Sequence, residues 1–165
     1  MKRKHLLWAM LPLMALITGC PVGVDFPLGE PGKEKLDEQL IGTWVQPDTA
    51  MEATRIAIEK IDKHSFKLTV LEEGGMFMEE TDFFRGWCTK VDGYTFVYLQ
   101  DLNNPAGQYL TYCYRMDGDD LYTYDMTLAV GGIDAVTSTE AFRKEVSASL
   151  KLEGSLTSEV KWSRQ

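Results

Sequence analysis

The stretch DFFRGWCTKVDGYTFVYLQD, residues 82–101, decides the fold of this chain. Aromatic and β-branched residues are frequent in both halves, which is typical of β-strands. Between the halves lies Asp92-Gly93, a pair that favours a two-residue type I′ turn because both residues tolerate positive φ. We therefore expect a hairpin whose facing pairs are Val91 with Tyr94, Thr89 with Phe96 and Trp87 with Tyr98. One face of this hairpin is then aromatic, and the other carries Cys88, Val97 and Leu99.

Short strands with the same alternation surround this hairpin. The expected strands cover residues 42–45, 55–61, 66–70, 82–91, 94–101, 108–116, 121–126 and 159–163. Leu36 and Leu40 are spaced for one or two helical turns before the first strand. Later, Thr137-Ser138-Thr139-Glu140 fits a capping box, and Phe142, Val146 and Leu150 predict a helix of about three turns that ends near Gly154.

This order predicts a mainly β fold, an antiparallel up-and-down meander that is closed or partly closed into a barrel. Closure removes the exposed edge strands that would otherwise promote aggregation. One C-terminal helix precedes the last strand, and that strand is well placed to pair with the first.

The turn Asp117-Gly118-Asp119 leaves two registers open. A three-residue loop places Tyr114 opposite Tyr122 and Tyr112 opposite Tyr124, which makes a ladder of four tyrosines. A two-residue loop shifts the register by one and places Tyr122 opposite Cys113. We favour the tyrosine ladder.

The run Leu40-Ile41-Gly42-Thr43-Trp44 resembles the Gly-x-Trp opening of lipocalins and of lipocalin-like bacterial lipoproteins. The resemblance covers most of residues 36–165 as a pattern, and Gly42 and Trp44 as residues. It implies that Trp44 plugs the floor of the barrel beneath a basic residue from the end of the last strand, here Arg164. It also accounts for a helix directly before the final strand.

Residues 1–20 have the organisation of an export signal. Lys2-Arg3-Lys4 forms a basic head, Leu6 to Ile17 an apolar run, and Thr18-Gly19 a small-residue site before Cys20. The apolar run is shorter than the about 20 residues that span a bilayer. Ile17-Thr18-Gly19-Cys20 resembles the lipobox of bacterial lipoproteins. That resemblance implies cleavage before Cys20, a thioether-linked diacylglycerol on Cys20, and acylation of the new amino terminus.

The chain therefore divides into three parts. Residues 1–19 are expected to be a lipoprotein signal peptide, and residues 34–165 the lipocalin-like barrel. Between them, residues 20–33 are expected to be the lipid anchor and a flexible tether, because Pro21 to Gly32 is rich in proline and glycine. The protein is expected in the cell envelope, at the outer membrane of a Gram-negative cell or at the inner membrane.

The charge of the mature part restricts its partners. All 25 acidic residues and all but three of the 17 basic residues follow Gly19, which gives the mature part a net charge of −11. Such a surface repels phosphate backbones and anionic head groups, so we expect no nucleic-acid binding. Attachment to the membrane is expected through the acylated Cys20.

Few residues suggest chemistry. His64 lies in an expected turn, and with Cys88 and Cys113 it forms no metal-ligand spacing. Asp117, Asp119 and Asp120 lack the order of a calcium loop, and we interpret them as a polar hairpin end. The sequence contains no Gly-x-Ser-x-Gly, P-loop or dinucleotide motif. We therefore predict no enzyme, no cofactor and no metal site.

Cys88 and Cys113 allow two interpretations. If the strands follow chain order, one strand separates them and places them about 10 Å apart. A disulfide needs Cα atoms within about 7 Å. We favour two buried thiols, and a disulfide between them is the alternative.

The aromatic residues of the middle strands are the best candidates for a binding wall. They are Trp87, Phe96, Tyr98, Tyr112, Tyr114, Tyr122 and Tyr124. A concave wall of this kind suits an apolar ligand, whereas the same residues also make an ordinary β-core. The predicted function is a non-enzymatic binding module for a small apolar ligand or a partner protein. The alternative is an envelope interaction or inhibitor lipoprotein with no ligand cavity.

Overall fold

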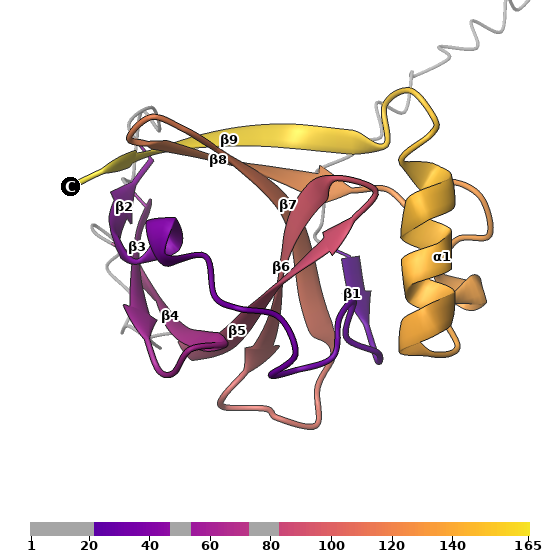
Figure 1. Ribbon diagram of the computed structural model, residues 1–165, viewed down its shortest axis with the longest axis horizontal. Coiled ribbons are helices and arrows are strands. Elements are labelled where there is room, and N and C mark those ends of the chain that lie inside the picture. The colour runs from indigo at the N-terminus through magenta and orange to yellow at the C-terminus, as the bar shows by residue number, and fades with distance from the viewer. Residues whose placement is uncertain (1–21, 47–53, 73–82) are drawn as a thin grey trace, which may run out of the picture.

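The computed structural model describes residues 22–46, 54–72 and 83–165, and its strands form a closed barrel. The barrel strands are β2 (Gly42–Val45), β3 (Thr54–Lys60), β4 (Ser65–Glu72), β5 (Phe83–Val91), β6 (Tyr94–Asp101), β7 (Tyr109–Asp117), β8 (Asp120–Met126) and β9 (Leu156–Arg164). Each strand pairs antiparallel with the next along the chain, and β9 pairs with β2. Figure 1 shows these strands as a ring. The predicted up-and-down barrel is confirmed.

The central hairpin has the predicted register. Val91 pairs with Tyr94, Thr89 with Phe96 and Trp87 with Tyr98. Asp92 and Gly93 adopt φ values of 49° and 87°, the backbone that a type I′ turn requires.

The helix α1 (Thr139–Ser149) precedes the last strand, as predicted. Its N-cap is Ser138, whose hydroxyl accepts a hydrogen bond from the Ala141 N–H, so the cap lies one residue later than the capping-box pattern indicated. Two short 3₁₀ helices, η1 (Glu38–Leu40) and η2 (Ile133–Ala135), complete the helical elements of the described residues. In Figure 1, α1 and a short strand, β1 (Val22–Val24), lie outside the ring on the same side.

The strand β1 corrects the expected tether. It pairs with Tyr109–Thr111 of β7, a stretch that β8 does not cover because the pairing of β8 with β7 begins at Tyr112. Val24 and Leu28 are 2% and 0% exposed. The prolines and glycines of this stretch therefore shape turns in a packed segment, and they do not form a flexible linker from residue 22 onward.

The β7–β8 turn has the two-residue loop of the alternative, but the facing pairs expected for both loop lengths are wrong. Asp117 pairs with Asp120 across a two-residue loop, in which Gly118 has a φ of 61°. Arg115 therefore faces Tyr122, and Tyr114 faces Thr123. The four-tyrosine ladder does not form, because Tyr122 lies on the opposite face of the sheet from Tyr112 and Tyr114.

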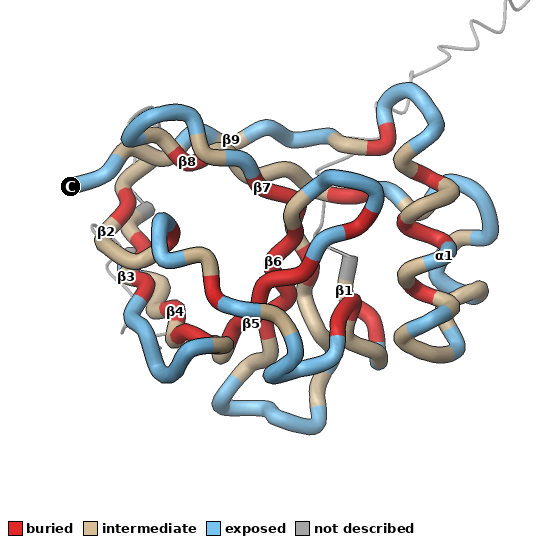
Figure 2. The backbone as a smooth tube through the Cα atoms, in the orientation of Figure 1, coloured by how far each residue is buried: buried red, intermediate tan, exposed pale blue. Residues whose placement is uncertain are grey.

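The alternation of side chains produces two hydrophobic cores. The first fills the barrel and includes Leu40, Trp44, Phe66 and Leu99. The second lies between the outer face of β5–β7 and the layer formed by α1 and the N-terminal segment. Figure 2 shows the buried residues along the ring and along α1.

The two cysteines lie in different cores, which excludes the alternative of a disulfide. Cys88 belongs to the barrel interior and Cys113 to the helix-side core. Both are buried free thiols, as the favoured interpretation predicted. The two thiols are separated by the intervening strand β6, as expected from the sequence. They also point to opposite faces of the sheet, which the sequence did not indicate.

Candidate binding site in the barrel

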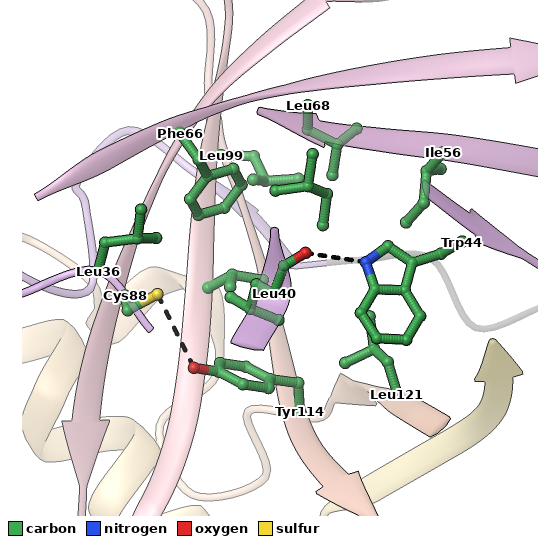
Figure 3. Close-up of a cluster of buried hydrophobic side chains, with 12 residues drawn as sticks. Leu36, Leu40, Trp44, Ile56, Phe66, Leu68, Cys88, Leu99, Tyr114 and Leu121 are labelled. Atoms are coloured by element: carbon green, nitrogen blue, oxygen red, sulfur yellow. Dashed lines mark hydrogen bonds between the residues drawn. The ribbon is translucent and has the colours of Figure 1, made fainter. Parts of the chain in front are cut away.

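One end of the barrel is closed by the segment before β2. Leu36 and Leu40 pack into this end, and Trp44 is completely buried beside them. The Trp44 indole N–H donates a hydrogen bond of 2.8 Å to the Leu40 carbonyl, which ties the indole to η1. Figure 3 shows Trp44, Leu40 and Tyr114 lying together in this cluster. The Tyr114 hydroxyl donates to a carboxylate oxygen of Asp37 at 3.0 Å, a further bond across the closed end.

Arg164 lies over Trp44, as the resemblance implied. Its guanidinium carbon is 4.4 Å from the centroid of the indole ring. Its two terminal nitrogens donate to the carbonyls of Ile41 and Gln39 at 2.7 and 2.6 Å. Gly42 is required here: its φ is 146°, and a Cβ at this position would lie 2.6 Å from the Arg164 Nη1. The last residues of β9 thus hold the chain that leads into β2.

Above this floor the barrel contains a cavity of about 310 Å³. Its apolar lining comes from η1 and from the strands β3 to β9. The lining residues are Leu40, Ile56, Ile58, Phe66, Leu68, Val70, Phe84, Val97, Leu99, Leu110, Tyr112, Tyr114, Leu121, Thr123, Tyr124, Asp125, Ser158, Val160 and Trp162.

The cavity opens at the end opposite Trp44. Leu40, Phe66 and Leu121 near the floor are 1–2% exposed. In contrast, Phe84 and Leu110 are only partly buried. They are the second residues of β5 and β7. Burial therefore decreases along the barrel axis toward the ends of β4, β6 and β8.

Polar groups of the cavity gather beside a β-bulge near this open end. Thr123 pairs with Val160 and Asp125 with Thr157, so two residues of β9 face Tyr124 alone. One of these two residues, Ser158, has a φ of 52°. Ser158 and Asp125 both line the cavity, and the bulge accounts for this polar patch in an apolar lining.

The predicted aromatic wall does not exist as one surface. Trp87, Phe96 and Tyr98 face away from the cavity and belong to the helix-side core. Tyr122 lies outside the barrel, with the Arg115 guanidinium carbon 3.8 Å from its ring centroid. Of the seven residues expected to form the wall, Tyr112 and Tyr114 turn their side chains toward the cavity. Tyr124 borders the cavity at the β-bulge, but its ring packs against the helix-side core and its hydroxyl accepts a hydrogen bond from Arg115 Nε at 2.8 Å.

The face of the hairpin that holds Val97 and Leu99 lines the cavity, together with aliphatic residues of β3 and β4. The alternation in the sequence separates these residues from the aromatic ones, but it does not say which face turns inward. Large aromatic residues packed under α1 instead. Trp87 and Tyr98 stack there with ring centroids 5.5 Å apart, and burial raises the pKa of the Tyr98 hydroxyl.

Arg143 of α1 connects the helix to the barrel wall. It donates hydrogen bonds to the Leu28 carbonyl at 3.1 Å, to the Thr89 hydroxyl at 3.0 Å and to the Lys90 carbonyl at 2.7 Å. One side chain therefore joins the helix, the N-terminal segment and β5. This network fixes the outer face of the strands whose inner face lines the cavity.

His64 lies in the β3–β4 turn, as predicted, where its Nδ1 is 2.8 Å from the Glu34 carbonyl oxygen. Among the described residues, no three His, Cys, Asp or Glu side chains are grouped closely enough to hold a metal ion. The same part of the chain contains no helix long and apolar enough to cross a membrane.

The comparisons with known proteins give no relatives. No protein-family model, no curated protein and no solved structure matches this chain.

Proposed function

We propose that this protein is an exported, lipid-anchored bacterial envelope protein whose barrel binds a small apolar ligand without transforming it. The observation that carries the binding proposal is the apolar cavity of about 310 Å³, closed at one end by Trp44. Small-molecule sites are mostly apolar, largely preformed cavities of about 300–1,000 Å³ with a few polar groups. The acidic surface charge supports the view that nucleic acids are not among its partners.

We assign the domain to a lipocalin-like type on three features. The strands follow an up-and-down order, α1 precedes the last strand, and Arg164 covers Trp44 beside Gly42. These features support a cup-shaped binding module, and they agree with the cavity.

The lipid anchor is supported by the pattern of residues 1–20. Since β1 begins at Val22, the chain between it and Cys20 extends about 7 Å at most. An acylated Cys20 would therefore hold the barrel close to the bilayer, where apolar ligands are abundant. Replacing Cys20 with serine should move the protein from the membrane fraction to the soluble fraction, because several acyl chains anchor a protein stably and none remains in the variant. Continued membrane fractionation of the unacylated variant would contradict the anchor.

Binding is tested with residues 20–165 carrying Cys20→Ser, which include every described residue. The neutral probe N-phenyl-1-naphthylamine should gain fluorescence on binding, and 1-decanol should displace it. Leu110→Trp fills the cavity from its open end and should abolish this binding. Leu102→Trp adds the same side chain at an exposed position and should leave it intact. If the probe does not bind, or if Leu110→Trp binds it normally, the cavity is not the site, and an interaction lipoprotein without a ligand becomes the better interpretation.

A further inference from the structure

The charge in the lining of the cavity is negative only. Among the lining residues Asp125 is the one charged side chain, and none is Lys, Arg or His. A cavity built for an anionic amphiphile such as a fatty acid would need a cationic group for its carboxylate. The described lining provides the opposite charge.

Asp125 points into the cavity. It pairs with Tyr112 across β7 and β8, and directly paired residues share one face of a sheet. Tyr112 and Asp125 both line the cavity, near its open end. Thr123 and Ser158 also line the cavity, and the Thr123 hydroxyl accepts a hydrogen bond from the Trp162 indole N–H at 3.0 Å.

No side chain of the described residues pairs with the Asp125 carboxylate by an ion pair or a hydrogen bond. Two other acids of this hairpin, Asp120 and Asp117, do have cationic partners. Asp120 contacts Lys161 at 2.7 Å, and Asp117 contacts Arg115 at 3.3 Å. Asp125 is half-buried near the open end of the cavity, and a cationic ligand group would supply the partner that its carboxylate lacks.

We propose that the cavity binds apolar amphiphiles with a protonated amine head, the amine contacting Asp125 and the chain lying among Leu68, Leu99 and Leu110. The inference rests on the proposed function and specifies its ligand class. The ammonium donates a charge-assisted hydrogen bond to the Asp125 carboxylate, and its other N–H groups donate to the hydroxyl oxygens of Thr123 and Ser158. An anionic head at the same place would meet Asp125 as a like charge. The net negative charge of the protein also attracts cations.

The test compares decylamine, 1-decanol and decanoate, which share a chain and differ in the head group. Dissociation constants are measured by probe displacement on residues 20–165 carrying Cys20→Ser. Decylamine should bind about tenfold more tightly than 1-decanol, and decanoate more weakly than both. Asp125→Asn should remove the advantage of the amine and leave decanol affinity within about twofold. Asp119→Asn makes the same charge change at an exposed site on the β7–β8 turn, at the other end of these strands, and should keep the advantage.

The outcomes separate the two proposals. If decanol binds and decylamine binds no more tightly, or if decanoate binds best, the amine assignment is wrong and the binding function stands. If Asp125→Asn keeps the amine preference, Asp125 is not the contact and the assignment is also wrong. If none of the three ligands binds, the proposed function fails. If Asp125→Asn does not fold, the affinities of decylamine, 1-decanol and decanoate for the protein that retains Asp125 still test the amine assignment.

Discussion

The guanidinium carbon of Arg164 lies 4.4 Å from the centroid of the Trp44 ring, and the two residues are direct cross-strand partners in β9 and β2. The contact joins the two ends of the barrel sequence. It also lies directly under the cavity, because Trp44 forms part of the core that closes this end. The stability of the closed barrel should therefore depend on this pair.

Replacing Arg164 with alanine should lower the free energy of unfolding by about 2 kcal/mol, since two charge-assisted hydrogen bonds and a cation–π contact are lost together. Arg164→Lys should recover part of this, because lysine keeps the charge and loses the planar fork. Urea unfolding followed by tryptophan fluorescence measures both. Lys151→Ala, at an exposed position after α1, is the control. A loss for Arg164→Ala no larger than that of the control would show that the contact does not hold the barrel closed.

Leu28→Ala tests whether the N-terminal segment is part of the domain. Leu28 is 0% exposed in the helix-side core, so its truncation should cost about 2–5 kcal/mol in urea unfolding. Leu102→Ala, at an exposed position, should change the stability by less than about 0.5 kcal/mol. Equal stability of the two variants would restore the interpretation of this segment as a tether.

The two thiols should react slowly in the native state. Burial raises the pKa of Cys113 from 9.0 to about 11 and also raises the pKa of Cys88. At pH 8 the thiolate fraction of Cys113 is then about 100-fold below that of an unfolded cysteine. Iodoacetamide labelling, read by mass spectrometry, should be slow in buffer and complete in urea. Rapid native labelling, or a mass two protons lower without reductant, would contradict buried free thiols.

The same shifts make stability depend on alkaline pH. An acid whose pKa is higher in the folded state retains its proton longer there, so folding is disfavoured as pH rises above 9, the value in the unfolded chain. Cys113→Ala should therefore reduce the loss of stability between about pH 9 and 11. Urea unfolding at pH 8 and pH 10 measures the free energy of unfolding of the Cys113→Ala variant and of the unsubstituted protein. An equal loss of stability in the two proteins between these pH values would show that Cys113 does not contribute.

Glu145 should contribute to stability above acidic pH. Burial raises the pKa of its carboxyl, but hydrogen bonds from the N–H groups of Gly131, Val130 and Gly132 outweigh this and hold the pKa below 4.5. The stabilisation is present above pH 4.5 and is lost as pH falls through the folded-state value. Glu145→Gln should be less stable by about 1–3 kcal/mol at pH 7, and the difference should shrink below pH 4.5. Thermal unfolding between pH 3 and 7 measures it; a difference that is constant with pH would exclude the carboxylate as its source.

Much of the architecture could be predicted from local patterns. Asp92-Gly93 fixed the register of the central hairpin because only one turn type suits that pair. The contact of Arg164 with Trp44 followed from the family resemblance. The favoured β7–β8 register failed because it assumed a three-residue loop, whereas the turn has two residues, Gly118 and Asp119. The alternative had the correct loop length, but a two-residue loop places Tyr122 opposite Arg115 and not opposite Cys113.

The site was harder to predict because strand alternation defines two faces without assigning the interior. Trp87 and Phe96 are as suitable for a cavity as for a helix interface, and α1 and Leu28 decide the matter by covering them. Asp125 gave no signal in the sequence, since its inward orientation depends on pairing with Tyr112. The bulge at Ser158 depends on how β8 and β9 pair, which is a long-range property.

Methyl NMR during a titration with 1-decanol tests most directly whether the barrel interior is the binding site. The account predicts saturable shifts, at one ligand per protein, for the methyl groups of Leu68, Leu99 and Leu110, and little change for Leu28 and Val146 of the helix-side core. Unchanged cavity methyls, or shifts confined to the helix-side core, would contradict it.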